Sequence, residues 1–76
     1  MAKKFQKGEK VEIDSTPEKL KLIQAQELQP GQEVFIIKKD FLDDGKNFYQ
    51  VGRTPNDKMT YVLPDIYLKK IENQNH

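Results

Sequence analysis

The stretch Glu33 to Gly52, EVFIIKKDFLDDGKNFYQVG, holds the clearest structural signals in the chain. Its first part, residues 33–39, is rich in β-branched and aromatic residues, which favour strands. Residues 43–47, DDGKN, come next, and Asp, Gly and Asn tolerate the left-handed backbone of hairpin turns. Residues 48–52 then form a second strand-like run. We therefore predict an antiparallel hairpin at the centre of the fold.

A second pattern occurs twice, with an offset of 23 residues. Each copy places an apolar residue, a glycine and two alternating aliphatic residues at the same offsets: Phe5, Gly8, Val11 and Ile13, then Leu28, Gly31, Val34 and Ile36. A glycine followed by period-two alternation is typical of a turn that leads into a half-buried strand. Two copies are too few for a solenoid, so we interpret them as similar turn–strand units of one domain.

The segment between these units carries conflicting signals. Thr16-Pro17-Glu18 supplies a capping residue, a proline at the first helical position and an early acidic residue, which together favour a helix start. Leu20 and Leu22, however, alternate with lysines at period two, as in a strand. We predict a strand or an extended loop here, with a short helix within 17–27 as the alternative.

The rest of the chain predicts one more strand and a last apolar patch. A polar turn at 54–58 precedes a strand at 59–63, which ends at Pro64 because proline cannot donate to a ladder. The patch comprises Tyr67, Leu68 and Ile71. Five short strands at roughly ten-residue spacing predict an all-β domain, a small antiparallel barrel or sandwich.

Length and composition limit the chain to one small domain. It has 76 residues, of which 36% are hydrophobic and 33% charged, with a net charge of +1 and no cysteine. We therefore expect a thin core without disulfides. The longest apolar run, Val34 to Ile37, is far below the roughly 20 residues that span a bilayer. We expect a cytoplasmic protein with a flexible basic arm at 1–4, a single domain at 5–71 and a disordered tail at 72–76.

The second half resembles a known family. It ends in Tyr61-Val62-Leu63-Pro64-Asp65-Ile66-Tyr67-Leu68, and the strand Phe48-Tyr49-Gln50-Val51 precedes it. From Leu28 to Ile71, this order of features is similar to Src homology 3 (SH3-like) domains and their bacterial relatives. The resemblance implies a five-stranded SH3-like barrel, with a 3-10 turn near Pro64–Tyr67. It also implies a peptide-binding shelf built from Phe48, Pro64 and Tyr67.

Two departures from the family pattern concern function more than fold. Phe48 stands where a tryptophan is usual, and the region 14–27 lacks the aromatic-rich motif that opens a peptide-binding SH3 domain. The resemblance therefore supports the fold better than it supports recognition of proline-rich peptides. It also suggests a bacterial cell-wall-binding domain, which would require export.

The sequence gives no indication of catalysis. General acid–base and nucleophilic mechanisms need a base beside the reacting group, and the only histidine is the terminal residue His76. Asp40, Asp43 and Asp44 lack the spacing of a calcium-binding loop and are best interpreted as a solvated turn. The glycines form no phosphate- or dinucleotide-binding motif. We predict a protein that is not an enzyme and has no cofactor or metal.

We predict instead a binding or adaptor module for a protein or peptide partner. Strand alternation places Tyr49 and Val51 on one face and Phe48 on the other, so Phe48 is the exposed candidate if Val51 is in the core. Exposed aromatic residues concentrate in interface hot spots. The predicted partner-binding residues are Phe48, Pro64 and Tyr67, with Asp43 and Asp44 selecting a basic flank. Homodimerisation through the aromatic residues stays open.

The alternative ligand is nucleic acid. Lysines cluster near the N-terminus, and neutralisation of phosphates by lysine dominates non-specific affinity for nucleic acids. The alternative site comprises Lys3, Lys4, Lys7, Lys10 and Arg53.

Overall fold

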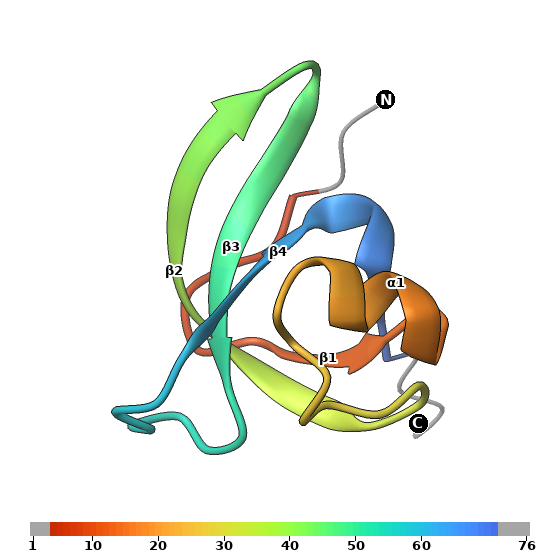
Figure 1. Cartoon of the computed structure of the whole chain (residues 1–76). Helices are drawn as coiled ribbons and strands as arrows, with labels where there is room; N and C mark the ends of the chain where they lie inside the picture. Colours follow the sequence, from red (N-terminus) through yellow and green to blue (C-terminus); the bar gives the residue numbers. More distant parts are fainter. Residues whose placement is uncertain (1–3, 72–76) are drawn as a thin grey trace.

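The computed structural model describes residues 4–71, and Figure 1 shows strands with one short helix at their side. The elements in chain order are β1 (Lys10–Ile13), α1 (Pro17–Leu22), β2 (Glu33–Asp43), β3 (Lys46–Gly52), β4 (Tyr61–Pro64), the 3-10 turn η1 (Asp65–Tyr67) and β5 (Leu68–Lys70). The predicted mainly-β class and the 3-10 turn are confirmed. The expected tail 72–76 and residues 1–3 of the expected arm lie outside the described residues.

The strands form one sheet in the order β4-β3-β2-β1-β5. Every pair of neighbouring strands is antiparallel. The long strand β2 pairs with β1 over its first residues, Glu33 to Phe35, and with β3 from Phe35 to Asp43. The sheet is therefore built on β2, with β4 and β5 as its outer strands.

The two turn–strand units predicted from the repeat have the same turn. Gly8 and Gly31 adopt φ angles of 85° and 82°, a region that glycine enters without steric cost. In the turns 6–9 and 29–32, a side-chain oxygen of the last residue accepts a hydrogen bond from the backbone amide of the first, at 2.9 Å in both. The repeated sequence pattern thus produces a repeated local structure.

The two units also pair with each other reciprocally. The amide of Gly8 donates to the carbonyl of Ile36 at 2.7 Å, and the amide of Gly31 donates to the carbonyl of Ile13 at 2.8 Å. Each bond joins the glycine of one unit to the last aliphatic residue of the other. Because equivalent atoms bond at equivalent positions, a local twofold axis relates the two units.

The predicted strand or extended loop at 17–27 is wrong at its start, where the structure has α1, and the alternative of a short helix is confirmed there. The hydroxyl oxygen of Thr16 accepts a hydrogen bond from the amide of Lys19 at 3.2 Å, which caps the helix, and Pro17 occupies its first turn. Leu20 is fully buried, whereas Leu22 is 82% exposed. Residues two apart point about 200° apart on a helix but to the same side of a strand. The different burial of Leu20 and Leu22 therefore fits a helix and not a strand.

The strand missing from 17–27 is replaced by β5, which was predicted only as an apolar patch. β5 pairs with β1, and Leu68 lies opposite Ile13. It has three residues, of which only Leu68 is buried. A strand this short shows too little alternation to be predicted from its sequence.

The core lies on one face of the curved sheet and is closed by residues of the helix, the loops and the N-terminal segment. Phe5 packs edge-on against Tyr49 with ring centroids 5.4 Å apart, and its amide donates to the Tyr49 hydroxyl at 3.0 Å. The buried hydrophobic residues are Phe5, Val11, Ile13, Leu20, Ala25, Leu28, Val34, Ile36, Tyr49, Val51, Leu63 and Leu68.

The β2–β3 hairpin extends beyond this core. Figure 1 shows its tip projecting past the other strands, and the molecule measures 37 × 25 × 23 Å along its principal axes. Every β2 residue from Lys38 to Asp43 is exposed. The register shifts between Ile36 and Lys38 and again between Lys39 and Phe41, and such bulges bend and twist a strand.

The two leucines of α1 provide a matched test of the helix. We expect Leu20→Ala to lower the free energy of unfolding by about 2–5 kcal/mol, because it leaves a cavity in the core. Leu22→Ala should change it by less than about 0.5 kcal/mol. Urea denaturation followed by circular dichroism measures both values. Similar losses in the two variants would show that both leucines face the core, as they would in a strand.

Candidate functional site

The tip of the β2–β3 hairpin is a two-residue turn. Asp44 and Gly45 have φ angles of 52° and 74°, and two positive values in sequence are typical of the turn that matches the twist of a hairpin. Asp43 lies opposite Lys46, and the register then places Phe41 opposite Phe48. The predicted turn is therefore present, and it fixes which residues face each other.

Phe41 and Phe48 form a stacked pair on the outer face of the hairpin. Their ring centroids are 4.5 Å apart and their planes differ by 9°. Phe41 is 45% exposed and Phe48 is half-buried, whereas Tyr49 on the opposite face is buried. Val62 of β4 lies opposite Gln50, two residues along β3 from Phe48, and is 38% exposed. We call Phe41, Phe48 and Val62 the aromatic face.

The structure brings two of the three predicted shelf residues together. Pro64 lies opposite Phe48 in the β3–β4 register, but it is buried, so it supports the aromatic face from the edge of the sheet. Tyr67 packs against the hydrophobic core, and its carbonyl accepts a hydrogen bond from the amide of Asp14 at 2.8 Å. Among the described residues, the ring that stacks on Phe48 is Phe41.

The predicted acidic residues lie at the tip of the hairpin. Asp43 is exposed, and Asp44 has an 86% exposed side chain that forms an ion pair with Lys46 at 3.5 Å. Exposed pairs of this kind contribute little to stability because water screens them. Lys46 nevertheless offsets the charge of Asp44, which leaves Asp43 as the stronger acidic group beside the aromatic face.

The five residues of the alternative site lie in different surroundings. Lys3 is outside the described residues, and Lys4 and Lys7 are exposed. Lys10 forms an ion pair with Glu33 at 3.5 Å and lies 5.5 Å from the centre of the Phe35 ring. Arg53 forms an ion pair with Asp57 at 3.9 Å. The carboxylates beside Lys10 and Arg53 reduce the attraction of these two residues for phosphate.

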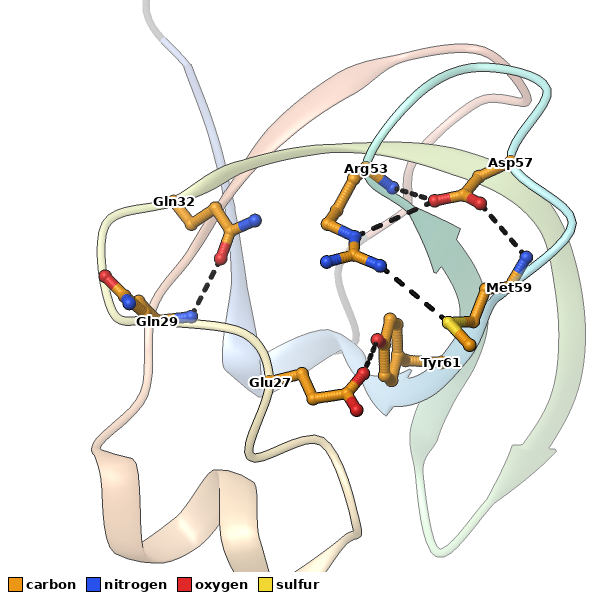
Figure 2. Close-up of polar contacts among 7 residues, drawn as sticks. All are labelled: Glu27, Gln29, Gln32, Arg53, Asp57, Met59 and Tyr61. Atoms are coloured by element: carbon orange, nitrogen blue, oxygen red, sulfur yellow. Dashed lines mark hydrogen bonds and ion pairs between the residues drawn. The ribbon is translucent and has the colours of Figure 1, made fainter.

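A polar cluster joins the loop at 53–60 to β4 and to the loop before β2. Figure 2 shows Arg53 extending toward Tyr61, with Asp57 and Met59 on one side. The Asp57 carboxylate accepts hydrogen bonds from the backbone amides of Met59 and Arg53, each at 3.0 Å. These two bonds, together with the Arg53 charge, hold the pKa of Asp57 below its ordinary value.

The other end of the cluster is the hydrogen bond from the Tyr61 hydroxyl to the Glu27 carboxylate. The residues are 34 positions apart, so the bond ties two distant segments together. This hydrogen bond, and to a lesser extent burial, raises the pKa of Tyr61 above its ordinary value of 10.0. A polar groove lined by Glu27 and residues 29–32 lies beside this bond. We interpret the cluster as a structural tie, because its charged groups are engaged with one another.

The described residues contain no group of three or more His, Cys, Asp or Glu side chains positioned to hold a metal ion. Nor does any helix in this part of the chain have the length and apolar composition of a membrane span. The candidate site is the aromatic face, because its stacked rings are partly exposed, and its chemistry is that of apolar contact.

Sequence reasoning missed Phe41. The signal was present, because counting outward from a two-residue turn at Asp44-Gly45 pairs 43 with 46, 42 with 47 and Phe41 with Phe48. The turn was predicted as the broader segment 43–47, which leaves the register undefined. A sharper assignment of the turn type predicts the aromatic pair directly.

No protein-family model matches the chain, and no curated protein or solved structure matches it either.

The Glu27–Tyr61 hydrogen bond should make the stability of the folded protein depend on pH, through the raised pKa of Tyr61. A pKa raised in the folded state contributes stability that is fully present below pH 10.0 and is lost as the pH rises through the folded value. We expect Glu27→Gln to bring the pKa of Tyr61 down toward its ordinary value, because the charged acceptor is removed. A ¹³C-tyrosine NMR titration, with Tyr61 assigned from Tyr61→Phe, measures this pKa.

Glu18→Gln is the matched control, since Glu18 is an exposed carboxylate on α1. It should leave the pKa of Tyr61 unchanged. An equal pKa in the wild type and in Glu27→Gln would contradict the assignment of Glu27 as the cause.

Proposed function

We propose that the protein is a non-catalytic binding module with an SH3-like fold, which recognises a segment of a protein partner through its aromatic face. The observation that carries the proposal is the Phe41–Phe48 stack, which exposes ring surface on a hairpin that projects from the core. Exposed apolar side chains that are grouped into a patch, rather than scattered singly, often mark an interaction site. Aromatic rings also supply much contact area for few rotatable bonds, which suits them to be interface anchors.

The SH3-like part of the proposal is supported by the order of the elements. A strand, an acidic hairpin turn, an aromatic strand, a polar turn and a strand ending in Pro64 are followed by η1 and β5. These are the features, in the same order, on which the family resemblance depends. In this proposal the bend of the long strand β2 curls the sheet into a partly open barrel, with β4 and β5 at its edges.

Recognition would proceed by apolar contact at the rings. An apolar or proline side chain of the partner packs on Phe41 and Phe48, while Pro64, which is buried, supports the ring of Phe48 from the neighbouring strand. Asp43 lies one row nearer the turn and favours a basic residue that flanks this side chain. Tyr67 contributes through the core, since its ring packs there rather than on Phe48.

The test uses a library of 12-residue peptides that contain proline, with and without a basic flank. Peptides enriched on the wild type are titrated into ¹⁵N-labelled protein, and amide shifts give the Kd. We expect shifts centred on Phe41, Phe48 and Val62. Phe48→Ala should weaken binding about 30-fold, because a buried aromatic anchor contributes on the order of 2 kcal/mol. Asp43→Asn should weaken only the peptides with a basic flank.

Leu22→Ala is the matched control, because Leu22 is an exposed apolar residue on α1. Its affinity should equal that of the wild type. Raising the salt concentration from 50 to 200 mM should change the peptide Kd by less than about threefold, since phosphate-dominated binding falls far more steeply. Binding of a twelve-residue oligothymidylate with shifts at Lys4 and Lys7, and no effect of Phe48→Ala, would contradict the proposal and favour nucleic acid.

A further inference from the structure

The outer face of the β2–β3 hairpin is arranged in three rows across the two strands. Asp43 pairs with Lys46 nearest the turn, Phe41 pairs with Phe48 in the middle, and Lys38 pairs with Gln50 nearest the core. Direct cross-strand partners share a face, and alternate residues of β3 do as well, so all three rows face outward. Along β2 the rows run from an acidic group through an aromatic ring to a basic group, and Asp40, at the bulge between the last two rows, directs its carboxylate to Gln50.

The two charged groups at the ends of this series have no ionic partner in the described part of the chain. Asp43 and Lys38 are both exposed, and neither forms an ion pair there. Their neighbours are engaged, because Lys46 pairs with Asp44 at 3.5 Å and the Gln50 amide lies 3.4 Å from the Asp40 carboxylate. Asp43 and Lys38 thus present unmatched charges on either side of the aromatic row.

This pattern is self-complementary. A second copy can be placed over this face by a twofold axis that lies between the two copies and runs across the strands at the Phe41–Phe48 row. This rotation places β2 of one copy over β2 of the other, with the two strands running in opposite directions. Asp43 of each copy then faces Lys38 of the second copy, while Phe41 and Phe48 face their own equivalents. In a twofold interface every contact occurs twice, so the arrangement makes two Asp43–Lys38 ion pairs around four stacked rings.

We propose that two copies of this chain associate face to face through the aromatic face, with Asp43 of each copy paired to Lys38 of the other. The inference rests on the proposed function in one respect, that the same face binds a peptide. The second copy and the peptide then compete, and the dimer is a resting state that covers the aromatic rings. By linkage, a peptide that binds only the monomer shifts the equilibrium toward the monomer.

The aromatic face is small, and its area indicates that the association of two copies is weak. A stable dimer buries about 1,200–2,000 Å² of total surface, and weak encounters bury less. Three rows of a two-stranded hairpin belong to the weak class. We therefore expect a concentration-dependent equilibrium, with dissociation constants between about 10 μM and 1 mM.

The experiment is sedimentation velocity of the full chain from about 10 μM to 1 mM, with charge-reversed variants. Asp43→Lys alone sets lysine against Lys38, and Lys38→Asp alone sets aspartate against Asp43. Each single variant should raise the dimer Kd about tenfold, because each interface then holds two like-charged pairs. An equimolar mixture of the two single variants restores both opposite-charge pairs and should return the Kd to within about threefold of the wild type.

The mixture contains the same two folded chains as the separate samples, so a folding defect in either variant cannot produce the rescue. Phe41→Ala should abolish dimerisation, whereas Leu22→Ala should not affect it. A wild type that stays monomeric at 1 mM, or a mixture no tighter than its components, would overturn the dimer. Neither result affects peptide binding, because the peptide titration is done on protein diluted below the concentration at which the dimer forms. A rescued dimer that binds no peptide would leave the dimer standing and remove the proposed function.

Discussion

The two positive φ angles at Asp44 and Gly45 are the constraint on which the rest of the structure depends. They define a two-residue turn, and the turn sets the register of β2 against β3. A slip of one residue would move every β3 side chain to the opposite face. Tyr49 would then leave the core, and Phe48 would enter it. The division of this hairpin into a buried face and an exposed aromatic face therefore follows from two backbone angles.

The other end of β2 is held by the two equivalent turn–strand units. Their amides and carbonyls bond reciprocally across the β1–β2 pair, so the base of the sheet is stabilised by backbone hydrogen bonds that satisfy both turns at once. The core sits at this end, next to Val11 and Val34. The tip of the hairpin is free of the core and exposes its outer face. One strand thus joins a structural base to a candidate binding surface.

The features of this fold that depend on adjacent residues could be predicted from the sequence, whereas those that depend on contacts between distant residues could not. The hairpin turn and the repeated glycine turns depend on a few adjacent residues, and both were predicted from those residues. The 3-10 turn was predicted from the family resemblance. The helix at 17–22 was predicted only as the alternative, because Leu20 and Leu22 fit a strand face as well as two sides of a helix. Phe41 was missed because its importance depends on register. The bond between Glu27 and Tyr61 joins residues 34 apart and leaves no pattern in the sequence.

The most direct measurement is a nuclear Overhauser spectrum of the β2–β3 hairpin in dilute solution. The account predicts ring-to-ring contacts between Phe41 and Phe48 and cross-strand contacts between Leu42 and Asn47, as the register requires. It also predicts that the ring of Tyr49 contacts Phe5 on the opposite face. Contacts from Phe41 to Asn47 or Tyr49 in place of Phe48 would mean a shifted register. The aromatic face, and the functions argued from it, would then be wrong.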